Sequence, residues 1–252
     1  MKLQVLSDTH SFDYDINDDA EIVVHAGDFC NNLRGCLEFD TYCKEIGKVP
    51  VFVLGNHDHY GSDLYNTIKF FKDNPQYNCL YPGKEIKVGD YTFVGGTLFT
   101  NFRKNTQTKS QFKLNKKVAE YYIRDFENIT INNGKHFVTS HEMLEVFNET
   151  LSHINKYKGV DKTIIVTHFP PSLKCLDPYW GFHPDASKLN PYFINDIDVK
   201  GHKLWISGHT HTAVDAMEDD CRLVINPFGY PNEQGKNGYI PELLIDLKDI
   251  YE

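Results

Sequence analysis

The stretch "VFVLGNHDHYG", residues 51–61, joins an apolar run directly to an asparagine, two histidines and an aspartate. The apolar run is typical of a strand buried on both faces, and Gly55 ends it. Polar side chains gathered at the end of a buried strand need a binding partner for their donor and acceptor atoms, and a metal ion or a phosphate is the usual one. The stretch therefore favours an α/β sheet with a ligand site at the carboxyl ends of its strands.

Two similar runs precede this stretch. "KLQVLSD" (2–8) and "AEIVVHAGD" (20–28) are short apolar segments that end in aspartate, which predicts two more strands. Between the second run and the opening stretch, "RGCLEFDTYCKEIG" (34–47) has apolar residues at helical spacing and ends at Gly47, a typical C-cap. The first quarter of the chain thus follows a β-α-β pattern.

The rest of the chain changes character. "KEIKVGDYTFVGGTLF" (84–99) predicts a hairpin that turns at Gly89 and Asp90. Two helices are expected over about 111–126 and 141–158, the second beginning with a capping box of Thr139 and Glu142. Four β-rich runs follow: "DKTIIVTHF" (161–169), "HKLWISGHTH" (202–211), "RLVINPFGY" (222–230) and "PELLIDL" (241–247). We expect one domain, 1–252, with a helical insertion at about 105–160 and a long active-site loop at about 169–198.

The composition excludes several classes of protein. The chain is 40% hydrophobic and 24% charged, as in an ordinary globular protein, and no apolar run is long enough to span a membrane. Its formal net charge of -9 disfavours long nucleic acid as a partner. The N-terminal apolar run is too short for a signal peptide, and the six cysteines include no C-x-x-C pair. We therefore expect a cytoplasmic protein with reduced cysteines and no membrane partner.

Eight polar residues stand at the ends of the predicted strands: Asp8, His10, Asp28, Asn56, His57, His168, His209 and His211. Their oxygen and imidazole nitrogen donors suit manganese, iron or zinc, and none is a thiolate. Each fragment alone has a plainer explanation: a turn at Asp8, a helix N-cap at Asp28, a packed histidine at His168, and a turn at 208–211. The five fragments in this order favour a shared metal site.

The order D-x-H, G-D, G-N-H-D, T-H and G-H-x-H, found at 8–10, 27–28, 55–58, 167–168 and 208–211, resembles the calcineurin-like metallophosphoesterase superfamily. The resemblance implies an α/β fold, a four-layer α-β-β-α sandwich of two facing mixed sheets flanked by helices. It also implies a binuclear centre of two divalent metal ions: manganese, iron or zinc, with magnesium or nickel as alternatives. One ion would be held by Asp8, His10 and His211, the other by Asn56, His168 and His209, with Asp28 bridging.

The same resemblance implies a phosphoesterase. Two cations clamp the attacking and leaving oxygens of a phosphoester, and a hydroxide held between them is the nucleophile. His57, which follows the ligand Asn56, is placed to act as general acid toward the leaving oxygen. Asp58 and His59 either orient these groups or are plain turn residues.

Departures from the protein Ser/Thr phosphatases bear on the substrate. Those enzymes continue the second motif into Asp-Arg-Gly, whereas Asn31 and Asn32 stand here, so the usual phosphate-gripping arginine is absent. Candidate substrate-binding residues are Asn31, Asn32, Arg34, His59, Arg103, Trp180 and His183. Tyr179, Trp180 and Phe182 would either stack on a nucleobase or anchor their loop. We expect phosphodiesters or small phosphomonoesters as substrates.

Two other hypotheses stay open. A non-catalytic metal-binding scaffold of the same fold is one, although His57 and all seven expected ligands are present. A nuclease is the other, disfavoured by the acidic balance. The sequence leaves the oligomeric state undetermined.

Overall fold

The computed structural model describes residues 1–11, 13–103, 108–177, 183 and 186–251. The strands are β1 (Lys2–Leu6), β2 (Ile22–His25), β3 (Val49–Phe52), β4 (Glu85–Val88), β5 (Tyr91–Gly96), β6 (Thr130–Ile131), β7 (His136–Phe137), β8 (Thr163–Thr167), β9 (Leu204–Ser207), β10 (Val214–Glu218), β11 (Cys221–Ile225) and β12 (Leu244–Asp246). The α-helices are α1 (Arg34–Glu45), α2 (Leu64–Asp73), α3 (Lys109–Tyr122), α4 (Asp125–Asn128), α5 (Ser140–Ile154), α7 (Asn190–Phe193) and α8 (Lys248–Tyr251).

Two mixed sheets form the centre of the molecule. The four-stranded sheet has the order β12-β1-β2-β3, in which β1, β2 and β3 are parallel and β12 is antiparallel. The six-stranded sheet has the order β10-β11-β9-β8-β5-β4, with the four inner strands parallel and an antiparallel strand at each edge. The parallel strands of each sheet end at one common edge, as the strand-exit pattern predicts.

Side-chain alternation along the strands builds three apolar layers. Val24 of β2 and Val166 of β8 belong to one buried cluster between the sheets. Their neighbours point the other way: Val23 packs with residues of α1 and α2, and Ile165 packs with residues of α5. Because successive side chains in a strand face opposite sides, each buried strand contributes to two layers.

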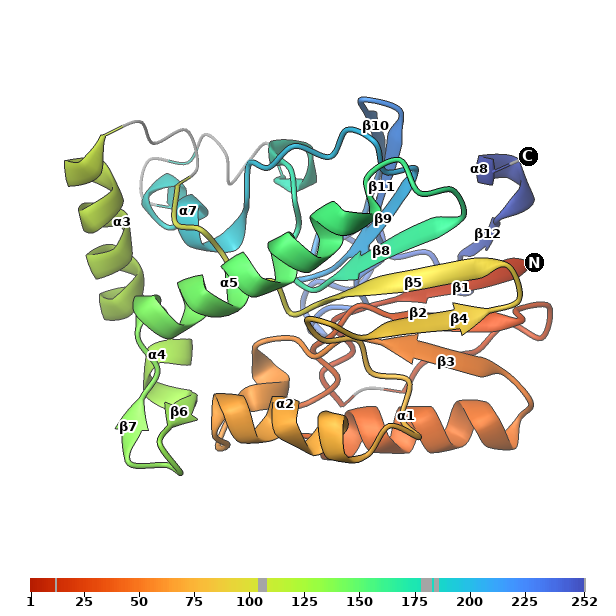
Figure 1. Cartoon of the computed structure of the whole chain (residues 1–252), viewed down its shortest axis with the longest axis horizontal. Coiled ribbons are helices and arrows are strands. Elements are labelled where there is room, and N and C mark those ends of the chain that lie inside the picture. The colour runs from red at the N-terminus through yellow and green to blue at the C-terminus, as the bar shows by residue number, and fades with distance from the viewer. Residues whose placement is uncertain (12, 104–107, 178–182, 184–185, 252) are drawn as a thin grey trace.

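Helices cover the outer face of each sheet (Figure 1). The helices α1 and α2 lie along the four-stranded sheet, and α5 crosses the six-stranded one. The predicted four-layer α-β-β-α sandwich is confirmed. Among the described residues, no helix combines the length and apolar character that crossing a membrane requires.

The middle of the chain differs in detail from the prediction. The helix expected over 111–126 ends at Tyr122, because Ile123 adopts an extended conformation (φ -93°, ψ 128°), and α4 begins at Asp125. The second expected helix is α5, with the predicted capping box and a 3₁₀ turn (Asn155–Tyr157) after it. The break at Ile123 brings Asp125, the first residue of α4, to the strand end at Asn56.

Candidate active site

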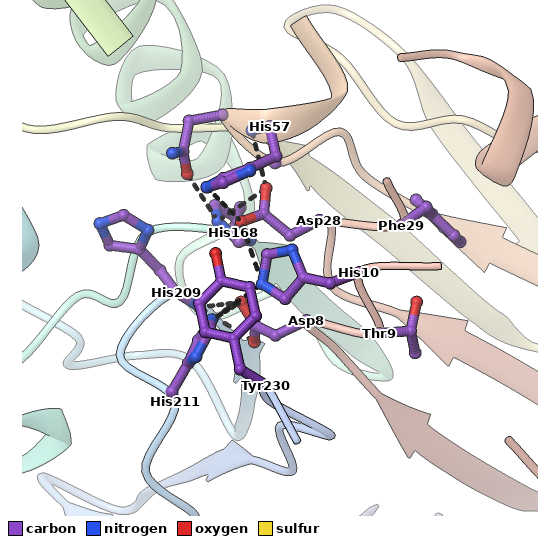
Figure 2. A network of polar contacts seen from close by, with 12 residues as sticks. Asp8, Thr9, His10, Asp28, Phe29, His57, His168, His209, His211 and Tyr230 are labelled. Carbon is purple, nitrogen blue, oxygen red and sulfur yellow. Dashed lines mark hydrogen bonds and ion pairs between the residues drawn. The ribbon is translucent and has the colours of Figure 1, made fainter. Parts of the chain in front are cut away.

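Strand ends from both sheets bring the expected ligands to one place (Figure 2). Asp8 and His10 follow β1, Asp28 follows β2, Asn56 follows β3, His168 follows β8, and His209 and His211 follow β9. Backbone hydrogen bonds join the loops: the Asp8 amide donates to the Gly27 carbonyl (2.9 Å), and the Gly208 amide donates to the His168 carbonyl (2.9 Å). The His209 amide donates to Asp8 Oδ1 at 3.0 Å, so a carboxylate of one sheet holds a loop of the other.

Five of the seven expected ligands have a left-handed backbone. Asp8, His10, Asp28, His209 and His211 have φ values of 55°, 47°, 60°, 72° and 51°. A non-glycine residue in this conformation is strained by about 1–3 kcal/mol, and such residues cluster at functional sites. The strain indicates that these loops are held for the direction in which their side chains point.

Glycines permit the close approach of two of these loops. A Cβ added at Gly55 would lie 2.0 Å from Asp28 Oδ1, and one added at Gly27 would lie 2.5 Å from the Gly55 amide nitrogen. Both distances are too short for any side chain. The glycines of the G-D and G-N-H-D motifs are therefore required for Asp28 and Asn56 to lie side by side.

The ligand atoms form overlapping groups that could hold metal ions. Asp8, His10 and His211 make one group, and Asp8, Asp28 and His168 make another, with the donor atoms of each within 4.8 Å of one another. A third group adds His57 to His10 and Asp28. Asp8, His10 and Asp28 each belong to two of these groups, so the three groups form one continuous cluster of donor atoms.

Hydrogen bonds fix which nitrogen of two histidines faces the centre. His168 Nδ1 lies 2.7 Å from the Ala26 carbonyl oxygen, and His211 Nδ1 lies 2.7 Å from Glu233 Oε2. Each Nδ1 donates its hydrogen outward, which leaves Nε2 for a metal. His211 Nε2 lies 3.0 Å from His10 Nε2, a spacing that suits two ligands of one ion.

His209 is the exception among the ligands. Its ring stacks against Phe169, with centroids 3.8 Å apart, and its centroid lies 5.0 Å from that of His168. The structure puts it in none of the metal-binding groups found among the described residues. Its Nε2 is buried and has no hydrogen-bond partner among those residues. Such an orphaned donor fits a metal, provided that the ring turns toward His168.

The charges of the site also fit cations. Burial opposes protonation of His168, but the nearby Asp28 outweighs burial and raises its pKa to about 9. Burial likewise opposes protonation of His211, yet Asp8 and Glu233 raise its pKa to about 10. In the absence of metal ions, the protonated rings neutralise part of the charge of the nearby carboxylates. Binding of metal ions to these histidines would release their protons.

His57 lies beside the ligand cluster without being enclosed by it. Its backbone N–H donates to Asp28 Oδ1 (2.9 Å), and its Nδ1 lies 2.8 Å from Asn31 Oδ1. The ring stacks on Tyr60, with centroids 4.4 Å apart and an interplanar angle of 24°. Because the Asn31 oxygen accepts from Nδ1, Nε2 is the nitrogen that faces the cluster, 4.0 Å from Asp28 Oδ2.

Asp58 joins the loops of the second and third motifs through hydrogen bonds. It is fully buried and accepts hydrogen bonds from four backbone amides, those of Asp28, Phe29, Cys30 and Gly55, at 2.8–3.3 Å. The carboxylate therefore orients the second and third motifs, and Asp58 is more than a turn residue.

We predict that Asp58→Ala lowers the free energy of unfolding by more than about 3 kcal/mol, because each buried amide left without an acceptor costs about 1–3 kcal/mol. Urea unfolding in the presence of chelator measures the loss. Asp63→Ala is the matched control. Asp63 accepts from the amides of Tyr65 and Asn66 at the start of α2 and from the Asn133 amide, all in exposed surroundings, so the loss should be only about 1–2 kcal/mol. Equal losses in the two variants would contradict the assigned role.

The structure corrects several expected substrate contacts. Asn31 lines the cavity, but Asn32 accepts from the Arg34 amide, and Arg34 pairs with Glu38 with 80% of its side chain exposed. Arg103 lies over the ring of Phe112.

His59 is buried, with its Nδ1 2.6 Å from the Thr67 hydroxyl. Asn32, Arg34, His59, Arg103 and His183 are absent from the described cavity lining. Trp180, with Tyr179 and Phe182, lies outside the described residues.

A cavity of about 960 Å³ opens over the ligands. Its lining includes the apolar residues Ile123, Leu176, Leu189 and Phe193, and Arg124 is the only Lys or Arg among the described lining residues. The sequence analysis did not single out Arg124, Asp125, Tyr230 or Glu233, which all line this cavity. Glu233 lies close after the "RLVINPFGY" run, but no local pattern marks it as a partner of His211.

Comparisons with known proteins agree with this geometry. The sequence model of the calcineurin-like phosphoesterases matches residues 1–213. The crystal structure of a phosphopantetheinyl hydrolase from Mycobacterium tuberculosis has a similar fold, with a TM-score of 0.68, 15% identity, and coverage of 96% of this chain and 94% of that one.

A cold-active protein-tyrosine phosphatase of a psychrophilic Shewanella species is more distant, with a TM-score of 0.34, 14% identity, and coverage of 88% and 70%. No curated protein sequence matches.

The family match spans most of the chain and includes all five motifs, and the structure places Asp and His side chains in groups suited to metal ions. Both findings support a metal-dependent phosphoesterase. The chain belongs to the calcineurin-like phosphoesterase family.

Proposed function

We propose that this protein is a binuclear-metal-dependent hydrolase of phosphodiesters or small phosphomonoesters. The observation that carries the proposal is the convergence of carboxylate and imidazole donors from both sheets at the floor of one cavity. In this proposal Asp8, His10 and His211 hold one ion. Asn56, His168 and His209 hold the other, and Asp28 joins the two.

The ions, manganese, iron or zinc by their donor set, would supply Lewis acidity at the phosphoryl group and acidify a water molecule. The side chains do the rest. Asp28 keeps a negative charge between the two ligand sets. His57 is held by Asn31 and Tyr60, with Nε2 4.0 Å from Asp28 Oδ2, so a ring that carries a proton on Nε2 can give it to the leaving oxygen.

The cavity supports an ester with an organic group of some size. Its volume of about 960 Å³ far exceeds what a phosphate needs, and part of its lining is apolar. The single described cation of the lining suits a substrate with few negative charges, such as a diester.

Hydrolysis of bis(4-nitrophenyl) phosphate and of 4-nitrophenyl phosphate, with manganese added, tests the proposal. We expect release of nitrophenolate from at least one of them, loss of activity on treatment with chelator, and recovery when manganese is restored. Metal-loaded protein that is inert toward both esters, cyclic nucleotides, phospholipid diesters and phosphopeptides would instead favour a non-catalytic scaffold.

We predict that Arg124→Ala raises KM about 5- to 10-fold with little change in kcat. The reason is that its guanidinium offers the substrate a charge-assisted hydrogen bond, which is weakened because Arg124 is exposed to solvent. Steady-state kinetics on the better nitrophenyl ester measures the change. Arg34→Ala and Arg103→Ala are matched controls outside the described cavity lining, and both should keep the wild-type KM. An unchanged KM in Arg124→Ala would remove Arg124 from the binding site.

A further inference from the structure

Asp125 is a buried carboxylate that the five motifs do not include. It begins α4, is 2% exposed and lines the cavity. It accepts hydrogen bonds from Asn56 Nδ2 (3.1 Å) and from the Tyr60 hydroxyl (2.5 Å), both at Oδ1, and from the Tyr192 hydroxyl at Oδ2. Burying a carboxylate costs more than burying a neutral side chain of the same shape, so its presence calls for a reason.

The reason lies in the two ends of the Asn56 amide. Only Oδ1 carries lone pairs that can bind a metal, and the amide could present either end to the centre. The Asp125 carboxyl oxygens are surrounded by donors, from Asn56 and from the hydroxyls of Tyr60 and Tyr192, so Asp125 acts as an acceptor and draws Nδ2 to itself. Asn56 Oδ1 consequently faces inward, where it lies 3.0 Å from His168 Nε2. We infer that Asp125 is a positioning residue that holds Asn56 in its metal-binding orientation.

The same carboxylate reaches the proposed acid through Tyr60. The Tyr60 hydroxyl shares Asp125 Oδ1 with Asn56, and the Tyr60 ring is the platform on which His57 stacks. One buried group thus restrains a metal ligand and the surface under His57. A neutral residue at 125 would loosen both.

Asp125 is not needed to attach its own segment. The Gly61 amide donates to the Asn128 carbonyl (2.8 Å), and the Thr130 amide donates to the Ser62 carbonyl (3.0 Å). Phe126 and Ile129 are also buried in the large apolar cluster. These contacts remain in Asp125→Asn, which keeps the size of the side chain, so this variant should fold.

The inference rests on the proposed metal site at Asn56, and its test reads metal binding instead of hydrolysis. Titration calorimetry with manganese on the metal-free full-length protein compares wild type, Asp125→Asn and Tyr192→Phe. We expect the first ion to bind Asp125→Asn as it binds wild type, and the second to bind about 10- to 100-fold more weakly. Tyr192→Phe removes a partner of Asp125 but keeps the bond to Asn56, so both affinities should stay within about twofold of wild type.

An exchange of the two side chains sharpens the test. Asn56→Asp alone would set two carboxylates against each other and weaken the second ion. The double variant Asn56→Asp with Asp125→Asn restores one donor and one acceptor across the pair, and the affinity for the second ion should return toward that of wild type.

The outcomes separate this inference from the proposed function. Wild-type affinity for both ions in Asp125→Asn would overturn the positioning role. Equal weakening in Tyr192→Phe, or no rescue in the double variant, would also overturn it by showing a merely structural effect. Wild-type protein that binds two ions but hydrolyses no ester would refute the proposed function alone, and a wild type without a second ion would refute both.

Discussion

Asp28→Asn should lose the second metal ion and reduce hydrolysis to less than about one thousandth of the wild-type rate. Asp28 belongs to two of the three metal-binding groups, and its oxygens lie 3.4 Å from His168 Nε2 and 4.0 Å from His57 Nε2. An amide of the same shape cannot supply the negative charge that two closely spaced dications require. Metal content by mass spectrometry and the rate on the nitrophenyl ester measure the two losses.

The matched control for Asp28→Asn is Asp40→Asn. Asp40 is also 2% exposed, but it pairs with Lys44 on the same helix, α1, and accepts from the Asn78 amide at 3.3 Å. This variant should keep both ions and the wild-type rate, even if its unfolding free energy falls. Two tightly bound ions in Asp28→Asn would show that another group bridges them.

His57→Ala should lower kcat by about 10²- to 10⁴-fold while both ions stay bound, because only the proton donor is removed. The bond to Asp28 comes from the backbone N–H of residue 57, so alanine keeps it. The loss should be greatest for esters of alkyl alcohols, whose leaving oxygen needs a proton, and smaller for nitrophenyl esters. Steady-state kinetics on both kinds of ester, with metal content measured alongside, provides the check.

His141→Ala is the control for His57→Ala. His141 is an exposed histidine at the start of α5. Among the described residues, its only ion-pair partner is Glu145. Its removal should leave kcat unchanged. A His57→Ala enzyme that hydrolyses alkyl and nitrophenyl esters at the wild-type rate would assign the acid to another group.

Much of the fold was predictable because the strands are short, buried runs that end in glycine or a polar residue. The elements that were not predicted include helix α2, which begins after its N-cap Asp63, and edge structures with weaker signals. Strand β10 (Val214–Glu218) is half exposed and joins β11 through Asp219 and Asp220, both with positive φ. The hairpin of β6 and β7 turns through an Asn-Gly pair at 133–134, which is a recognisable turn signal. Its strands have only two residues each, too few to show an alternating pattern.

The helix break had no local signal of comparable strength. Ile123 fits the apolar periodicity that predicts one helix over 111–126, yet it is extended. The buried hydrogen bonds of Asp125 to Asn56, Tyr60 and Tyr192 are made from the far side of that break. Long-range contacts of this kind override local helix preference.

The candidate site divides in the same way. Asp8, Asp28 and His168 come together because each directly follows a parallel strand, so the sheets fix their positions. The expected substrate contacts Arg34 and Arg103 lie on loops and helix starts, whose direction the sequence pattern leaves undetermined. The partners Asp125 and Glu233 reach the site through contacts distant in sequence, which a single chain without known contacts does not reveal.

Anomalous diffraction from crystals grown with manganese would show directly whether the site holds two ions. We predict two peaks about 3.5–4 Å apart. Asp28 should bind both ions, His209 should have turned to join His168 and Asn56 at one, and Asp8, His10 and His211 should surround the other. A single ion, or a pair of ions to which His168 and His209 contribute no ligand, would contradict this prediction.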